Sequence, residues 1–151
     1  MIMKTKIAAK YIYEGLGFPV KLHKVEMVKV GKEWAPKIDV RKVAKDVMKE
    51  LPFQASRLTG AQIYFIREYL GMSLRDFATK VVHQSHMAVS KWEKFDQKPT
   101  NMDASTEVVL RLFVFHEAIG KKANIEKKFM KAYETISSMN FKNVGAKALG
   151  F

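Results

Sequence analysis

The sequence predicts an α+β fold, in which a small N-terminal β-hairpin or sheet module precedes a mainly α-helical domain. The prediction rests on a change of period along the chain. Between residues 18 and 30, apolar and charged side chains mix at the short period of strands, and from Asp39 onward apolar side chains recur at helical spacing. A chain of 151 residues has the length of one domain or of two small ones, and it can bury a hydrophobic core without disulfides or structural metals.

Composition narrows the class of protein. The chain has no Cys, which excludes a disulfide framework, a thiolate zinc site and a cysteine nucleophile. Its formal net charge of +12 favours a polyanionic partner such as nucleic acid, although the charge by itself fits any soluble basic protein equally well. No apolar run reaches the roughly 18–20 residues of a membrane span, and the basic N-terminus has no apolar signal region. We therefore expect a cytoplasmic protein without a membrane partner.

The N-terminal module is expected to hold two or three strands. A short strand at 11–13 would end at the turn 15–17, which contains two glycines. The stretch 18–30 alternates at both ends but not in the middle, which indicates a bulge or a turn within it. Gly31-Lys32 fits a two-residue hairpin turn that leads into a strand at 33–35. So small a sheet is marginal alone and must pack on another element.

A first helix is expected between Asp39, a good N-cap, and Pro52, a residue that ends helices. One helical stripe holds its apolar side chains, which are Val40, Val43, Ala44, Val47, Met48 and Leu51. Residues 53–58 have no such pattern, so we interpret them as a short linker.

Three helices then follow in quick succession, each with a capping residue at its start. Thr59 and Gln62 fit a capping box, Ser73 can cap a second helix, and Ser85 can cap a third. Only about residues 82–85 connect the last two helices. Short helices joined by so tight a turn must cross at a steep angle, which is the geometry of a helix-turn-helix.

Two further helices are expected on the C-terminal side of this motif. The first starts near Asp103 and ends at Gly120; it is nearly apolar all round, as in helices buried at a core or at a subunit contact. Residues 123–138 form a second, more charged helix. The remainder, 139–151, contains two glycines and is expected to be a mobile tail.

The segment 58–100 carries the residues that point to function. It combines an arginine and a glycine around the first helix, a Phe-Ala pair in the second, and a Trp-Glu pair that ends the third: Arg67, Gly71, Ser73, Phe77-Ala78, Ser85, Val89-Ser90-Lys91-Trp92-Glu93 and Lys98-Pro99. With these residues it resembles the lambda-repressor-like helix-turn-helix of the Xre/Cro family. The resemblance covers about 43 of the 151 residues. It implies a largely buried, structural ion pair between Arg67 and Glu93.

The resemblance also implies that the third helix enters the major groove of double-stranded DNA. Its outward side chains would then read base edges: His86, Met87, Ser90 and Lys91. Phosphate contacts would come from residues at or near the ends of the helices: Ser85, Arg75, Lys94 and Lys98. The domain that contains the motif would span residues 53–138, after an N-terminal module at 1–52.

The sequence departs from the Xre/Cro pattern in two places. Leu74 stands where the family often has a DNA-contacting Gln, which removes one expected contact. Lys94-Phe95 replaces the family's Asn-Gly, which implies a different exit from the third helix.

The overall layout is similar to that of MqsA-type antitoxins of type II toxin–antitoxin systems. The stretch from Tyr13-Glu14-Gly15 to Pro19-Val20 carries this likeness. Those proteins normally hold zinc through a Cys-rich module. Because this chain has no Cys, the likeness implies that packing replaces the metal in the N-terminal module.

The sequence thus predicts a transcriptional regulator, a repressor or autorepressor, which binds its operator as a homodimer without a cofactor or a metal and is not an enzyme. Two alternatives stay open. The chain could be an antitoxin that binds a cognate toxin as well as its own operator, or a small basic ribonuclease that uses His83 or His86. These two His residues have no third ligand nearby, which argues against a metal site.

Overall fold

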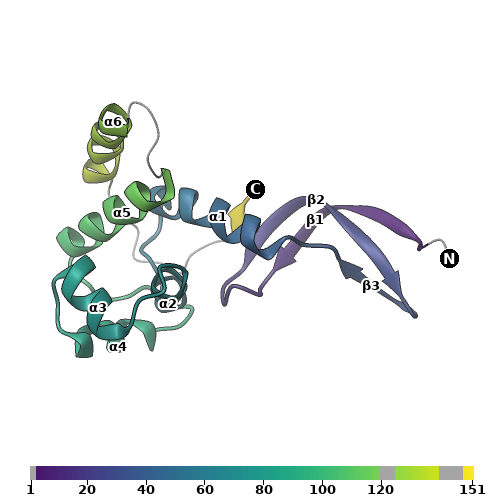
Figure 1. Cartoon of the computed structure of the whole chain (residues 1–151), viewed down its shortest axis with the longest axis horizontal. Helices are drawn as coiled ribbons and strands as arrows, with labels where there is room; N and C mark the ends of the chain where they lie inside the picture. Colours follow the sequence, from purple (N-terminus) through teal and green to yellow (C-terminus); the bar gives the residue numbers. More distant parts are fainter. Residues whose placement is uncertain (1–2, 120–124, 140–147) are drawn as a thin grey trace.

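We describe the chain from a computed structural model, which places residues 3–119, 125–139 and 148–151. A small antiparallel sheet is followed by a body of helices, from which the far end of the sheet projects (Figure 1). The α+β class predicted from the sequence is therefore confirmed. Its elements are β1 (Thr5–Tyr13), β2 (Val20–Val30), β3 (Glu33–Pro36), α1 (Val40–Glu50), η1 (Leu51–Phe53), α2 (Gly60–Tyr69), α3 (Leu74–Phe77), η2 (Ala78–Val82), α4 (His86–Glu93), α5 (Ala104–Ile119), α6 (Ile125–Ser138) and β4 (Leu149–Gly150).

The sheet is built on β2, which pairs with β1 along one edge and with β3 along the other. Its two turns lie where the glycines predict them, and Gly17 and Gly31 have φ angles of 96° and 61°. Strand β1 is longer than the expected 11–13, since its pairing with β2 continues from Tyr13 back to Thr5. The additional residues of β1 form a strand because they pair with β2, and the sequence of β1 alone does not show this pairing.

The interruption within β2 is neither a turn nor an inserted residue. The register of β1 against β2 is the same on both sides of Lys24, whose φ angle of 54° lies in the left-handed region. Leu22 and Val25, one on each side of Lys24, are both buried. The left-handed conformation of Lys24 thus shifts the alternation of buried and exposed side chains by one residue. As a result, both halves of the strand bury their apolar side chains.

Local capping fixes the starts of the helices, as predicted. Asp39, Thr59, Ser73 and Ser85 each accept a hydrogen bond from a backbone N–H three residues further on. Thr59 forms the complete capping box with Gln62. The second helix of the motif differs from expectation, because after one α-helical turn it continues as the π-helix η2.

Helix α5 differs from the nearly apolar helix that the sequence predicts, because its buried face contains charged residues. Glu107 and Arg111 lie on its buried face, and both side chains are fully buried. Arg111 Nη2 lies 2.8 Å from Glu107 Oε2, and Arg57 Nε lies 2.9 Å from Glu107 Oε1. Burial lowers the pKa of the Arg111 guanidinium, and the charge of Glu107 opposes this shift.

The supposed linker at 53–58 is held by this charged cluster. Arg111 donates to the backbone carbonyls of Pro52, Gln54 and Ser56. The side chains of Gln54 and Gln62 donate to one another, at 3.0 and 2.7 Å. The segment is therefore part of the packed structure, and it fixes the start of α2 against α5.

One hydrophobic core runs through both parts of the chain. It extends from Val20 in β2 through Met48 in α1 and Ile66 in α2 to Val114 in α5. This core contains residues of both expected parts, 1–52 and 53–138. Part of the expected tail joins the same structure, because Leu149 and Gly150 pair in parallel with β2.

The rest of the tail, 140–147, and the helix end expected at Gly120 lie outside the described residues. Within the described residues, no helix is both long and apolar enough to cross a membrane.

Candidate nucleic-acid interface

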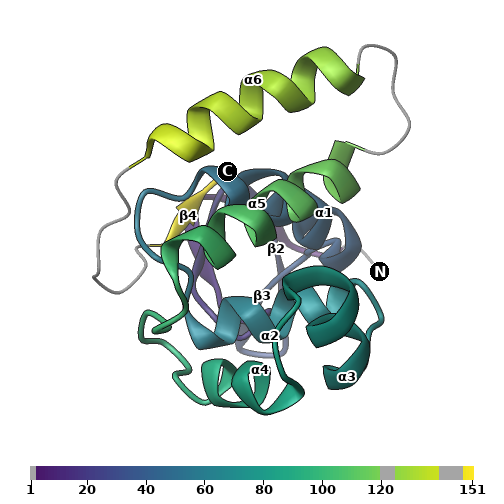
Figure 2. The same cartoon turned by 90° about the vertical axis from the view of Figure 1, so that its left-hand side faces the viewer.

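Helix α4 lies on the outside of the helical body, with α2, then α5 and then α6 above it (Figure 2). Its inner face packs into the core through Val89, which is 0% exposed, and Trp92, which is 6% exposed. Met87 and Lys91 are exposed on the other side, and His86 and Ser90 are partly exposed. The four residues expected to read bases thus lie on the accessible side of α4: His86, Met87, Ser90 and Lys91.

The turn before α4 contains a left-handed residue. His83 has a φ angle of 53° and is exposed, and the N–H of Gln84 donates to the carbonyl of Ala78 at 3.0 Å. In a π-helix the hydrogen bonds join residues i and i+5, so each hydrogen-bonded loop contains one residue more than in an α-helix. The extra residue in η2 and the left-handed turn together set where α4 begins.

An ion pair joins α4 to α2. Arg67 Nε donates to Glu93 Oε1 at 2.8 Å, and the two side chains are 13% and 12% exposed. Arg67 Nη1 also donates to the carbonyl of Met72, in the turn after α2. The expected pair between Arg67 and Glu93 is therefore present, and it ties the C-terminal end of α4 to the first helix of the motif.

Three lysines gather where α4 ends. Lys91, Lys94 and Lys98 line a hollow of about 420 Å³ together with Phe95. The three lysines are exposed, so their charges are available to an anion. Of the other residues expected to contact phosphate, Ser85 is exposed at the start of α4, where its hydroxyl accepts from the Ala88 N–H. Arg75 is exposed on α3, away from this hollow.

A second hollow, of about 450 Å³, brings in residues that the sequence pattern did not indicate. It lies between α4 and the segment that leads into α5. Met87 and Lys91 line one side, and Asn101, Asp103 and Thr106 line the other. No spacing rule connects these polar residues to α4, because the fold brings them there from 10 to 20 residues away. Asn101 and Thr106 are candidates for further contacts beside the expected ones, whereas the carboxylate of Asp103 would repel phosphates.

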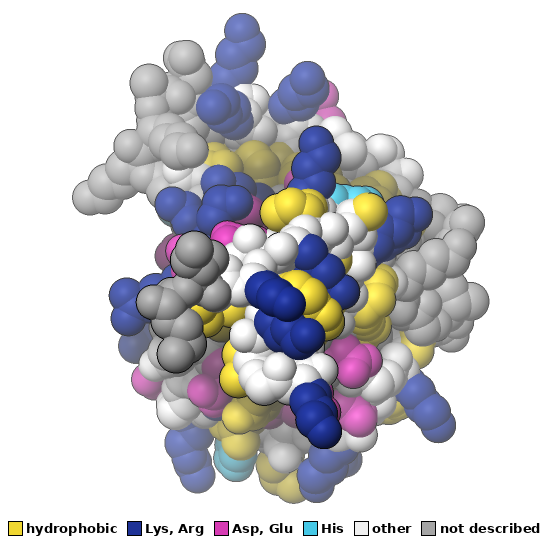
Figure 3. All heavy atoms as spheres, turned by 90° about the vertical axis from the view of Figure 1, so that its right-hand side faces the viewer, with side chains coloured by type: hydrophobic (Ala, Val, Ile, Leu, Met, Phe, Trp, Pro, Cys, Tyr) yellow, Lys and Arg dark blue, Asp and Glu magenta, His cyan; other side chains and the backbone are white. Residues whose placement is uncertain are grey.

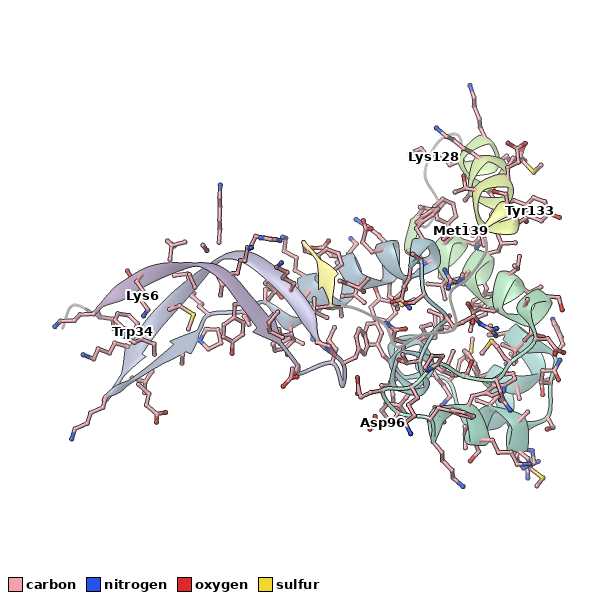
Figure 4. All side chains as sticks on the ribbon, turned by 180° about the vertical axis from the view of Figure 1, so that it is seen from behind. Lys6, Trp34, Asp96, Lys128, Tyr133 and Met139 are labelled. Atoms are coloured by element: carbon pink, nitrogen blue, oxygen red, sulfur yellow. The ribbon has the colours of Figure 1, made fainter. Side chains whose placement is uncertain are left out.

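The loop after α4 is fixed by the start of α2. Asp96 has a φ angle of 52°, and its carbonyl accepts from the Ala61 N–H at 2.8 Å. It lies on the side of the helical body toward the sheet (Figure 4). A Cβ on Gly60 would lie 2.4 Å from the Trp92 carbonyl oxygen, so only glycine allows this approach. The chain thus leaves α4 through a left-handed aspartate three residues after Glu93.

The histidines show no metal-binding arrangement. Among the described residues, no group of three or more His, Cys, Asp or Glu side chains could hold a metal ion. His83 lies in the turn and His86 in the first turn of α4.

Comparison of the chain with models of protein families, with curated proteins and with solved structures finds no match. The likeness to the Xre/Cro family therefore rests on the residues of the motif, and its functional implications stay predictions.

Proposed function

We propose that the chain is a sequence-specific regulator that binds double-stranded DNA and reads the major groove with α4. The observation that carries this proposal is the division of α4 into two faces. Val89 and Trp92 hold the helix in the core, while Met87 and Lys91 are exposed at the surface of a helix pinned by the Arg67–Glu93 pair. A helix fixed in this way can present the hydrogen-bond donor of Lys91 and the apolar side chain of Met87 to base edges.

The lysines at the end of α4 support the same proposal. Lys94 and Lys98 lie beside Lys91 and can neutralise phosphates on either side of a groove. The net charge of +12 adds a general attraction to a polyanion. We further propose that the protein represses transcription as a homodimer, because a two-fold dimer matches a palindromic operator.

Selection from random duplex DNA tests binding and returns the preferred half-site. Lys91→Ala should then flatten the preference at one base pair, at a cost of about 1–3 kcal/mol for the preferred base. Lys98→Ala should weaken binding to all sequences alike. Lys32→Ala, at the exposed hairpin turn between β2 and β3, is the control and should change neither property. Unchanged base preferences in Lys91→Ala would mean that α4 does not read DNA.

A second candidate function is that of an antitoxin whose sheet binds a partner protein. The far part of the sheet exposes Ile7 (66%) and Val30 (61%), away from α4. Lys and Arg side chains gather beside hydrophobic ones at its end (Figure 3). Lys6 Nζ and Lys29 Nζ lie 4.4 Å and 6.0 Å from the centre of the Trp34 ring (Figure 4). Coexpression with the product of the neighbouring gene tests this candidate. A stable complex that Ile7→Asp abolishes would favour it.

A further inference from the structure

An apolar pocket of about 370 Å³ lies between η2, α5 and α6, on the side of the body where α6 lies over α5 (Figure 2). Its walls include Val109 and Phe113 from α5 and Phe129 from α6. The volume is in the range of sites that hold small molecules. The pocket does not overlap the surface of α4 that we propose for DNA.

The polar groups around this pocket are all basic or potentially basic. Lys80 and His83 come from η2 and the turn that follows it, and His116 comes from α5. All three are exposed, and none of the described lining residues is acidic. Outside this lining, Glu117 Oε1 lies 3.8 Å from His116 Nδ1. Lys80 thus supplies a positive charge, and the two imidazoles supply hydrogen-bond donors.

We propose that this pocket binds a small apolar monocarboxylate. The aromatic and aliphatic walls would take the hydrocarbon part, and Lys80 with the two His would take the carboxylate at the rim. A phosphorylated or sugar ligand fits poorly because most of the lining is apolar.

A second copy of the chain is a weaker occupant for this pocket. In a two-fold dimer, each copy would present the same basic rim to its partner. The Lys80 side chains of the two copies would then bring like charges together, which opposes association. A negatively charged small ligand satisfies both the apolar walls and the rim.

The pocket also touches the segment that precedes α4. Lys80 belongs to η2, and His83 is the left-handed residue of the turn. A bound ligand would therefore contact the connection that positions α4. The binding itself does not depend on the proposed function in DNA recognition, and the test below contains no DNA.

Titration calorimetry with octanoate tests the proposal, with 1-octanol and octylammonium as matched probes of the same chain length. We expect saturable binding of octanoate, weaker binding of octanol and none of octylammonium. Lys80→Met should weaken octanoate binding at least about fivefold, since it removes a charged hydrogen-bond donor. Lys32→Met removes an exposed lysine at the hairpin turn and should leave the affinity unchanged.

Val109→Trp provides a second test that does not involve charge. Val109 is 46% exposed at the pocket, so the larger side chain can fill the space without disturbing the core. It should abolish octanoate binding while far-ultraviolet circular dichroism stays unchanged. Equal binding of octanoate and octylammonium, or octanoate binding that survives both Lys80→Met and Val109→Trp, would overturn the proposal.

Discussion

Glu107 is the centre of the charged cluster inside the helical body. It accepts from both Arg57 and Arg111, and its carboxylate also lies within hydrogen-bond distance of the Leu58 N–H. Arg111 in turn donates to backbone carbonyls before α2. A charged cluster in the interior is stable only when its members are all paired, so each residue depends on the others.

Glu107→Gln should therefore destabilise the protein strongly. The substitution keeps the shape of the side chain but leaves two arginines without their counter-charge, at a cost of roughly 3–5 kcal/mol. Urea denaturation measures the loss. The control is Asp46→Asn, which removes a partly exposed pair with Lys42 and should cost less than about 1 kcal/mol. Similar losses in both variants would contradict the role of Glu107.

The Arg67–Glu93 pair can be tested in the same way. Glu93→Ala should cost about 3 kcal/mol, because it leaves Arg67 largely buried without its partner. Glu68→Ala is a matched control, since Glu68 lies 3.7 Å from the same arginine but is 56% exposed. It should cost less than about 1 kcal/mol. If Glu93→Ala melts like the parent, the pair does not stabilise the motif.

At the scale of elements, β4 connects the end of the chain to its beginning. Phe151 donates to the Lys21 carbonyl at 2.9 Å and accepts from the His23 N–H at 3.0 Å. Leu149 and Phe151 also pack on the edge of the core. The strand thus completes the edge of β2 that β3 does not reach.

Removal of residues 148–151 should destabilise the sheet. The loss of two partly buried apolar side chains should cost about 2–4 kcal/mol, measured by urea denaturation. Ile7→Ala, on an exposed face of β1, is the control and should cost less than about 1 kcal/mol. A truncated protein as stable as the parent would show that β4 adds nothing to the fold.

At the scale of the whole molecule, the positive charge should make DNA binding depend strongly on salt. Each phosphate that a lysine neutralises contributes about −0.9 to the slope of log K against log salt. Lys98→Ala should reduce the magnitude of that slope by about one, and Lys32→Ala should leave it unchanged. Fluorescence anisotropy with a labelled duplex between 50 and 200 mM salt measures the slope. A flat response in the parent protein would contradict the use of this charge on DNA.

Elements whose signals are local can be predicted from the sequence. The caps Asp39, Thr59, Ser73 and Ser85 bond to backbone groups only three residues away, so four consecutive residues suffice to place each helix start. The burial of Val89 and Trp92 followed from helical spacing for the same reason. These local signals also placed the accessible face of α4, on which the candidate site lies.

Features that join residues far apart in the sequence could be seen only in the folded chain. Strand β1 extends to Thr5 only because β2 offers partners, and β4 pairs with residues about 130 positions earlier in the chain. Arg111, a charged residue in a helix that is otherwise largely apolar, is buried because Glu107 and the carbonyls before α2 compensate its charge. Periodicity reports which face of an element is buried; it contains no information about which distant partner makes that burial favourable.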